Sequence, residues 1–179
     1  MNKLIIKEFP MKPILMYASL LLLAFGSLSA VPSPSANYFV IEGMQVEWAY
    51  EGDLLTFKLH SPYQGWVGLG FNANNDIVNS NLVMGAVAEQ GPSMEEFFVV
   101  GFGNPQPVKS LGGQVAVKDY QGAEDAKGTS FQFSIDTSIQ DDFHYDLSEG
   151  QKVWLICSYS MEDDFGHHSI MRRHLEISL

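Results

Sequence analysis

Apolar and polar residues alternate along much of the chain after residue 40, with the period of two that is typical of half-buried β-strands. Residues 44–50 and 54–60 both alternate in this way, and Glu51-Gly52-Asp53 between them supplies turn-forming residues, so this part predicts a β-hairpin. Further short strands are predicted at 66–71, 82–88, 96–101, 114–119, 129–135, 152–159 and 172–179. The sequence contains no convincing helical period.

Nine short strands separated by Gly, Asn, Asp and Pro predict an all-β fold, an antiparallel β-sandwich of about nine or more strands. Residues 101–113 are rich in Gly and Pro and predict a long connection, the kind of segment that carries binding loops on a sandwich. There is no internal repeat and no interdomain linker. We therefore expect a single domain at 40–179, preceded by an extended leader at 31–39.

The first thirty residues have the layout of a secretory signal peptide. Lys3, Lys7 and Lys12 precede an apolar run at 14–25, and small residues follow at 26–30. The apolar run is shorter than the roughly 20 residues that a membrane-spanning helix needs, and no later segment is apolar for long enough either. The sequence predicts a secreted or periplasmic protein with no membrane span in its mature chain.

The formal charge of the chain is −11, and removing residues 1–30, with three lysines and one glutamate, makes it −13. An acidic surface disfavours nucleic acid and anionic lipid, because both attract basic patches. Such a surface suits a basic redox partner, or serves solubility alone. The single cysteine, Cys157, excludes an intramolecular disulfide, and its apolar neighbours predict a buried thiol.

Two segments carry candidate chemistry. The run 166–179 places two adjacent histidines, His167 and His168, just before the strand that ends the chain, which is a candidate metal or haem site. The second segment, Gly65-Trp66-Val67-Gly68-Leu69-Gly70-Phe71-Asn72, is an apolar strand with repeated glycines that leads into an Asn-rich loop.

These two segments, together with residues 81–87, resemble the DOMON domain family over residues 40–179. The resemblance implies an exported β-sandwich that binds haem b or a sugar, as in the cytochrome domain of cellobiose dehydrogenase. It also implies that His168 is an axial ligand of the haem iron, because the family places a histidine before the last strand and an arginine four positions later, here Arg172.

The chain departs from this family at the second axial ligand. Haem-binding members use a methionine in the loop before the strand that begins near residue 81, and here that position is Ile77 or Val78, depending on a one-residue choice of alignment. Neither side chain can bind iron. Four other side chains carry a donor that binds haem iron, and the sequence leaves them open together with a five-coordinate haem held by His168 alone: Met84, Met161, His167 and His144.

We therefore expect an exported DOMON-like binding module that binds haem b for extracytoplasmic electron transfer or redox sensing, with His168 as the iron ligand and His167 and Met84 as further cofactor-binding residues. The alternative is a haem-free module that binds a carbohydrate or another small ligand at its loop rim. The acidic, histidine-containing stretch 161–168 fits either a solvated turn or a metal site. No catalytic motif is present, which argues against an enzyme.

Overall fold

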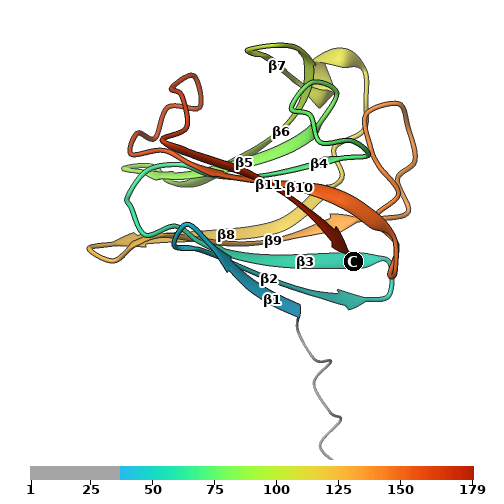
Figure 1. Cartoon of the computed structure of the whole chain (residues 1–179). Helices are drawn as coiled ribbons and strands as arrows, with labels where there is room; N and C mark the ends of the chain where they lie inside the picture. Colours follow the sequence, from blue (N-terminus) through green and yellow to red (C-terminus); the bar gives the residue numbers. More distant parts are fainter. Residues whose placement is uncertain (1–36) are drawn as a thin grey trace, which may run out of the picture. The chain divides into compact units, whose positions relative to one another are not determined.

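The computed structural model describes residues 37–179, which form eleven strands and one short 3-10 helix. One antiparallel sheet has five strands, in the spatial order β1 (Asn37–Ile41), β2 (Met44–Glu51), β3 (Leu54–His60), β9 (Gly128–Asp136) and β8 (Val117–Asp125). The other has six, in the order β11 (Met171–Ser178), β10 (Lys152–Tyr159), β4 (Val67–Asn72), β5 (Asn81–Ala88), β6 (Gly91–Gly101) and β7 (Asn104–Pro107). The helix η1 (Val108–Leu111) follows β7. The two sheets form the two layers of a β-sandwich (Figure 1).

The predicted all-β sandwich is confirmed, and so is the hairpin, which is the β2–β3 pair with Glu51 opposite Leu54. Two strands lie outside the predicted set. Residues 37–41 form β1 and pair with β2, so the described domain begins inside the expected leader. The predicted connection at 101–113 contains β7 and η1. The predicted signal peptide lies outside the described residues.

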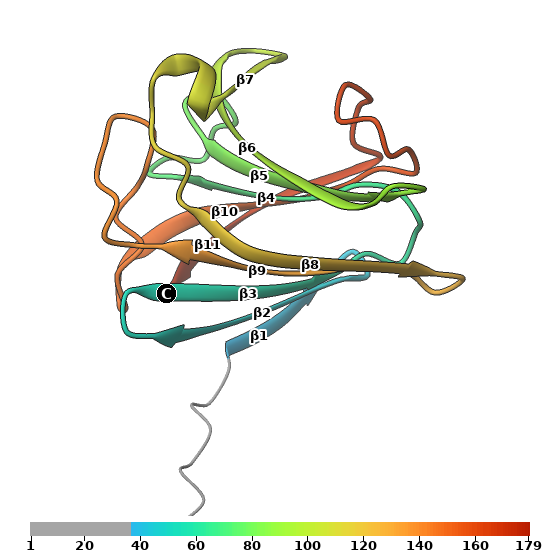
Figure 2. The ribbon, with the colours of Figure 1, turned by 180° about the vertical axis from the view of Figure 1, so that it is seen from behind.

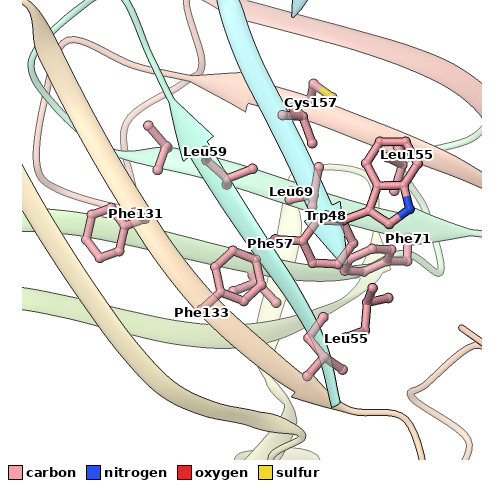
Figure 3. Close-up of a cluster of buried hydrophobic side chains, with 14 of the residues drawn as sticks. Trp48, Leu55, Phe57, Leu59, Leu69, Phe71, Phe131, Phe133, Leu155 and Cys157 are labelled. Carbon is pink, nitrogen blue, oxygen red and sulfur yellow. The ribbon is translucent and has the colours of Figure 1, made fainter. Parts of the chain in front are cut away.

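The core lies between the two sheets and is built from the inward residues of both, as the alternation predicts (Figure 3). Phe57 on β3 is fully buried, and its ring centroid lies 5.5 Å from that of Phe71 on β4 and 5.7 Å from that of Phe133 on β9. The thiol of Cys157 is also buried there, and burial raises its pKa to about 12. It is therefore an unreactive packing residue, as expected.

Strands β4 and β5 are buried on both faces, which is unusual for a two-layer sandwich. Their inward residues enter the sandwich core, while the outward residues of β5 join neighbours in a second apolar group on the outer face of the six-stranded sheet. This group, called the outer cluster below, consists of Trp66, Leu82, Met84, Ala86, Phe97 and Val99. Ile77 and Phe165, from two different loops, pack against it.

Within residues 37–179, no helix has the length and apolar character needed to cross a membrane.

Two phenylalanines provide a matched test of the core. Phe57→Ala should lower the free energy of unfolding by about 3 to 5 kcal/mol, because the substitution leaves a cavity between two packed rings. Phe102→Ala should change it by less than about 0.5 kcal/mol, because Phe102 is 85% exposed. Urea denaturation followed by tryptophan fluorescence measures both values, and equal losses for the two variants would contradict this assignment of the core.

Candidate ligand pocket

A pocket of about 300 Å³ opens on the outer face of the six-stranded sheet. Its floor is formed by outer-cluster residues and by Ser158 on β10, and its walls come from three connections between strands. The β6–β7 turn and the β10–β11 loop (residues 160–170) both rise from the side of this sheet that faces away from the five-stranded sheet (Figures 1 and 2). The third wall is the β4–β5 loop (residues 73–80), which contributes Ile77.

Gly68 on β4 allows the residues at the floor of the pocket to pack together. A Cβ atom built on Gly68 would lie 2.8 Å from Oγ of Ser158, and also within 3.6 Å of side-chain atoms of Trp66 and Met84. These three residues line the pocket. The missing side chain therefore lets them approach one another across β4, and a larger residue here would fill the floor of the pocket.

The β10–β11 loop is anchored at its beginning and at its middle. Its first residues pair with the segment before β4, because the backbone N–H of Trp66 donates to O of Glu162 at 2.9 Å and that of Ser160 donates to O of Trp66 at 3.0 Å. Gly65 allows this contact, since its φ is +120° and a Cβ atom would lie 2.6 Å from O of Ser160. Further along, the ring of Phe165 packs edge-on against Phe97 of the outer cluster, 6.1 Å between centroids.

The β4–β5 loop is organised by one side chain, that of Asn72. Its amide donates to O of Asp76 at 2.7 Å and to O of Val78 at 2.9 Å, while its Oδ1 accepts from the backbone N–H of Asn74. The two carbonyls flank Ile77, so these bonds fix the residue that lines the pocket. On the other side of the loop, Nδ1 of His174 on β11 lies 2.8 Å from Oδ1 of Asn75.

The rim of the pocket is basic, although the chain as a whole is acidic. His167, His168 and Arg172 line it, and no carboxylate is among the lining residues. Within residues 37–179 the guanidinium of Arg172 makes no ion pair. Its charge also acts on His174 of the same strand. Burial lowers the pKa of His174, and the positive charge of Arg172 lowers it further. The rim therefore favours a ligand that carries negative charge next to an apolar body.

All three residues expected to bind a cofactor, His168, His167 and Met84, line this one pocket. Of the two positions at which the family's methionine is missing, Ile77 lines the pocket and Val78 does not. Two of the alternative iron ligands lie elsewhere. Met161 is exposed outside the pocket, and both ring nitrogens of His144 contact carboxylates in the interior.

The acidic stretch 161–168 does not assemble a metal site. Among the described residues, no three His, Cys, Asp or Glu side chains gather closely enough to hold an ion. The carboxylate of Asp164 instead accepts the backbone N–H of Gly166 at 2.8 Å and lies 3.4 Å from Nδ1 of His167, which is consistent with a solvated turn.

Sequence reasoning missed part of the pocket. Trp66 belongs to the outer cluster and lines the pocket, but the sequence did not single it out as a cofactor-binding residue. Phe102, on the β6–β7 turn, and Phe165 were not singled out at all. One sequence feature could have indicated them: β4 and β5 are apolar on both faces, so something other than the second sheet has to cover the outer one.

A second cavity, of about 390 Å³, lies on the outer face of the five-stranded sheet. Its lining differs in character from that of the first. The amides of Gln45, Gln121 and Gln132 line it, together with Tyr38, which is 57% exposed. Two charged residues in the lining, Lys58 and Glu47, neutralise each other in an ion pair of 2.9 Å. The surface of this cavity is mainly apolar, with side-chain amides along it, and the charges of Lys58 and Glu47 cancel.

The fold and the first pocket define a class of protein: a two-layer antiparallel β-sandwich with a ligand pocket on the outer face of one sheet. The family model of the DOMON domain matches residues 41–160, and the chain belongs to this family. Among solved structures, the chain is similar to the cytochrome b domain of pyranose dehydrogenase from Coprinopsis cinerea, with a TM-score of 0.57 and 9% sequence identity. The similarity covers 80% of this chain and 81% of that chain, and at this identity it is a similarity of fold.

Proposed function

We propose that this DOMON domain is a haem b-binding module that acts in electron transfer or redox sensing outside the cytoplasm, rather than an enzyme. The observation that carries the proposal is the pocket on the six-stranded sheet, which combines an apolar floor with His168 and Arg172 at its rim. The fold shared with a cytochrome b domain adds support. Export follows from the signal peptide expected at residues 1–30.

The residues of the pocket fit the chemical parts of haem b. The apolar outer cluster suits the flat macrocycle and keeps water away from it. The imidazole of His168 supplies the nitrogen donor that haem iron takes from proteins. The guanidinium of Arg172 suits a propionate, because it offers several N–H donors to a carboxylate. Bound haem supplies a one-electron redox couple.

Ile77 limits which iron ligands the wall of the pocket would offer to a haem. It occupies the place of the family's methionine and presents only carbon, so this wall provides no iron ligand. The one thioether among the lining residues is Met84 on the floor. A haem in this pocket would be held by His168 alone, or by His168 together with one of the two other donors in the lining, Met84 and His167. The acidic chain suits a basic redox partner protein, through complementary charge.

A pair of histidine variants tests the iron ligand. Purified protein reconstituted with haem should show a Soret band, and His168→Gln should abolish or strongly shift it, because the substitution removes the axial nitrogen. His174→Gln should leave the band unchanged, since His174 does not line the pocket and its ring bonds to Asn75. Absorption spectra of the three proteins measure this. Wild-type protein that is folded but stays colourless with excess haem would overturn the proposal.

A pair of methionine variants tests the missing ligand. Ile77→Met should place a thioether in the pocket and raise the reduction potential of the haem, as thioether ligation does in cytochromes. Val78→Met is the matched control and should leave the potential unchanged, because Val78 does not line the pocket. Spectroelectrochemical titration measures both potentials. If the two variants have the same reduction potential, the assignment of Ile77 to the wall of the pocket is wrong.

A second candidate function is carbohydrate binding, and the cavity on the five-stranded sheet favours it through its side-chain amides and its exposed tyrosine. The three glutamine amides there offer both donors and acceptors, which is what neighbouring sugar hydroxyls require. The exposed ring of Tyr38 provides a face against which a sugar ring can stack. The sequence led us to expect a carbohydrate site at the loop rim, whereas this cavity lies on the face of a sheet.

Two tyrosine variants test the second candidate. Neutral hexasaccharides of β-linked glucose or xylose should raise the melting temperature of the wild-type protein, because a ligand that binds only the folded state stabilises it. Tyr38→Ala should abolish this shift. Tyr120→Ala should retain it, since Tyr120 is similarly exposed but does not line the cavity. No shift in the wild-type protein with either sugar would count against carbohydrate binding at this cavity.

A further inference from the structure

The imidazole of His144 is held between two carboxylates, one fully buried and one partly exposed. Its Nε2 lies 2.9 Å from Oε1 of Glu96, and its Nδ1 lies 2.6 Å from Oδ1 of Asp141. The side chains of His144 and Glu96 are 5% and 0% exposed. An ionised carboxylate only accepts hydrogen bonds, so the ring satisfies both neighbours only when both nitrogens carry protons, that is, as a cation.

The same two carboxylates tie together four parts of the chain. Glu96 on β6 also accepts from the side-chain amide of Asn81 on β5 at 2.9 Å and from the backbone N–H of Ala116, before β8, at 2.8 Å. Asp141 also accepts from the backbone N–H of Gln114 at 3.1 Å. His144 and Asp141 belong to the β9–β10 loop (residues 137–151), so the imidazole fastens this loop to the six-stranded sheet.

The residue after His144 reaches the wall of the ligand pocket. The hydroxyl of Tyr145 lies 2.7 Å from O of Asn79, to which it donates, and 3.3 Å from Oδ1 of Asn72. Asn72 is the side chain that fixes the β4–β5 loop on either side of Ile77. The imidazole is therefore connected to a wall of the pocket in two steps: the backbone joins His144 to Tyr145, and the hydroxyl of Tyr145 bonds to Asn79 and Asn72 of the β4–β5 loop.

We propose that His144 is a proton-controlled latch for the ligand pocket: its cationic form locks the β9–β10 loop, and Tyr145 then holds the β4–β5 loop, with Ile77, against the pocket. When the imidazole loses a proton, one ring nitrogen presents a lone pair to a carboxylate and that bond is lost. The β9–β10 loop then loosens, and the wall loosens with it. This inference rests on the proposed function only for the identity of the ligand.

The direction of the pH effect follows from the groups around the ring. The charged groups that face His144 are Glu96 on β6 and Asp141 on its own loop, and the partners from β5 and from the segment before β8 are neutral. Burial lowers the pKa of His144, but the hydrogen bonds to Glu96 and Asp141 outweigh it and leave the pKa above the ordinary 6.5. Burial raises the pKa of Glu96, but its bonds to His144 and Asn81 leave it below 4.5.

The latch is therefore closed in a window of pH. The contribution of His144 to stability is complete below pH 6.5 and is lost as pH rises through its raised pKa. The contribution of Glu96 is complete above pH 4.5 and is lost as pH falls through its lowered pKa. Both are present between these limits, and the pocket wall loosens on the alkaline side.

Hydrogen–deuterium exchange of the β4–β5 loop, measured on the protein without haem, tests the latch. After correction for the intrinsic pH dependence of exchange, the amides of residues 73–80 should lose protection in the wild-type protein as the pH rises above 6.5 and the histidine loses its proton. In Tyr145→Phe these amides should exchange about fivefold faster at low pH, because one hydrogen bond to the loop is lost, and the change with pH should disappear.

Two more variants complete the experiment. Tyr50→Phe removes the matched bond from β2 to the same β9–β10 loop, where the hydroxyl of Tyr50 donates to O of Leu147 at 2.6 Å, and exchange of residues 73–80 should stay at the wild-type rate. His144→Gln should exchange fast at every pH. If Tyr145→Phe matches the wild type, or if His144→Gln keeps the wild-type pH dependence, the latch is refuted. Because these measurements need no haem, a protein that fails to bind haem leaves this test intact.

Discussion

The burial of β4 and β5 on both faces is the constraint on which the site depends. A two-layer sandwich needs only one apolar face on each sheet, and the other faces water. Here the outer face of the six-stranded sheet carries an apolar cluster of its own, so it has to be covered by something other than the second sheet. The β4–β5 and β10–β11 loops provide this cover through Ile77 and Phe165. The space they leave uncovered is the ligand pocket.

A second constraint lies in the buried charge of Glu96. A carboxylate in the interior is costly unless cations and hydrogen-bond donors surround it. His144, Asn81 and the backbone N–H of Ala116 meet this need, but each comes from a different part of the chain. Satisfying one charge therefore fastens the β9–β10 loop and the segment before β8 to the six-stranded sheet. The loop that is fastened in this way carries Tyr145, and this is how an interior charge comes to bear on a pocket wall.

The strand pattern could be predicted because alternation is a local property of the sequence. The two strands that were missed show its limits. β7 (Asn104–Pro107) contains two prolines, which lack the N–H that a sheet requires and are tolerated only because β7 is an edge strand. β1 (Asn37–Ile41) is short and follows a Pro- and Ser-rich stretch, so the sequence predicted an extended leader there instead of a strand.

The pocket could be predicted only in part. The two histidines stood out because they precede a strand, whereas Met84 lies in an apolar strand, where a methionine that only packs in the core is the ordinary case. Alternation separates Leu82, Met84 and Ala86 from Val83, yet when both sets are apolar it cannot tell which face meets the other sheet. The network of His144 lay beyond the sequence altogether, since its contact with Glu96 joins residues 48 positions apart. Such contacts depend on the order of the strands in the sheets, and the alternation of apolar and polar residues does not reveal that order.

One departure of this chain from the family pattern, the missing methionine, falls in a loop that is otherwise firmly held. Ile77 sits between the two carbonyls that Asn72 binds, and the loop is tied further by Tyr145 and by His174. A backbone restrained on several sides presents whatever residue stands at position 77 to the same pocket. The restrained loop fixes where the side chain of residue 77 lies. The type of that residue alone then decides whether the wall can bind a metal. An aliphatic residue in so restrained a position makes this side of the pocket an apolar surface.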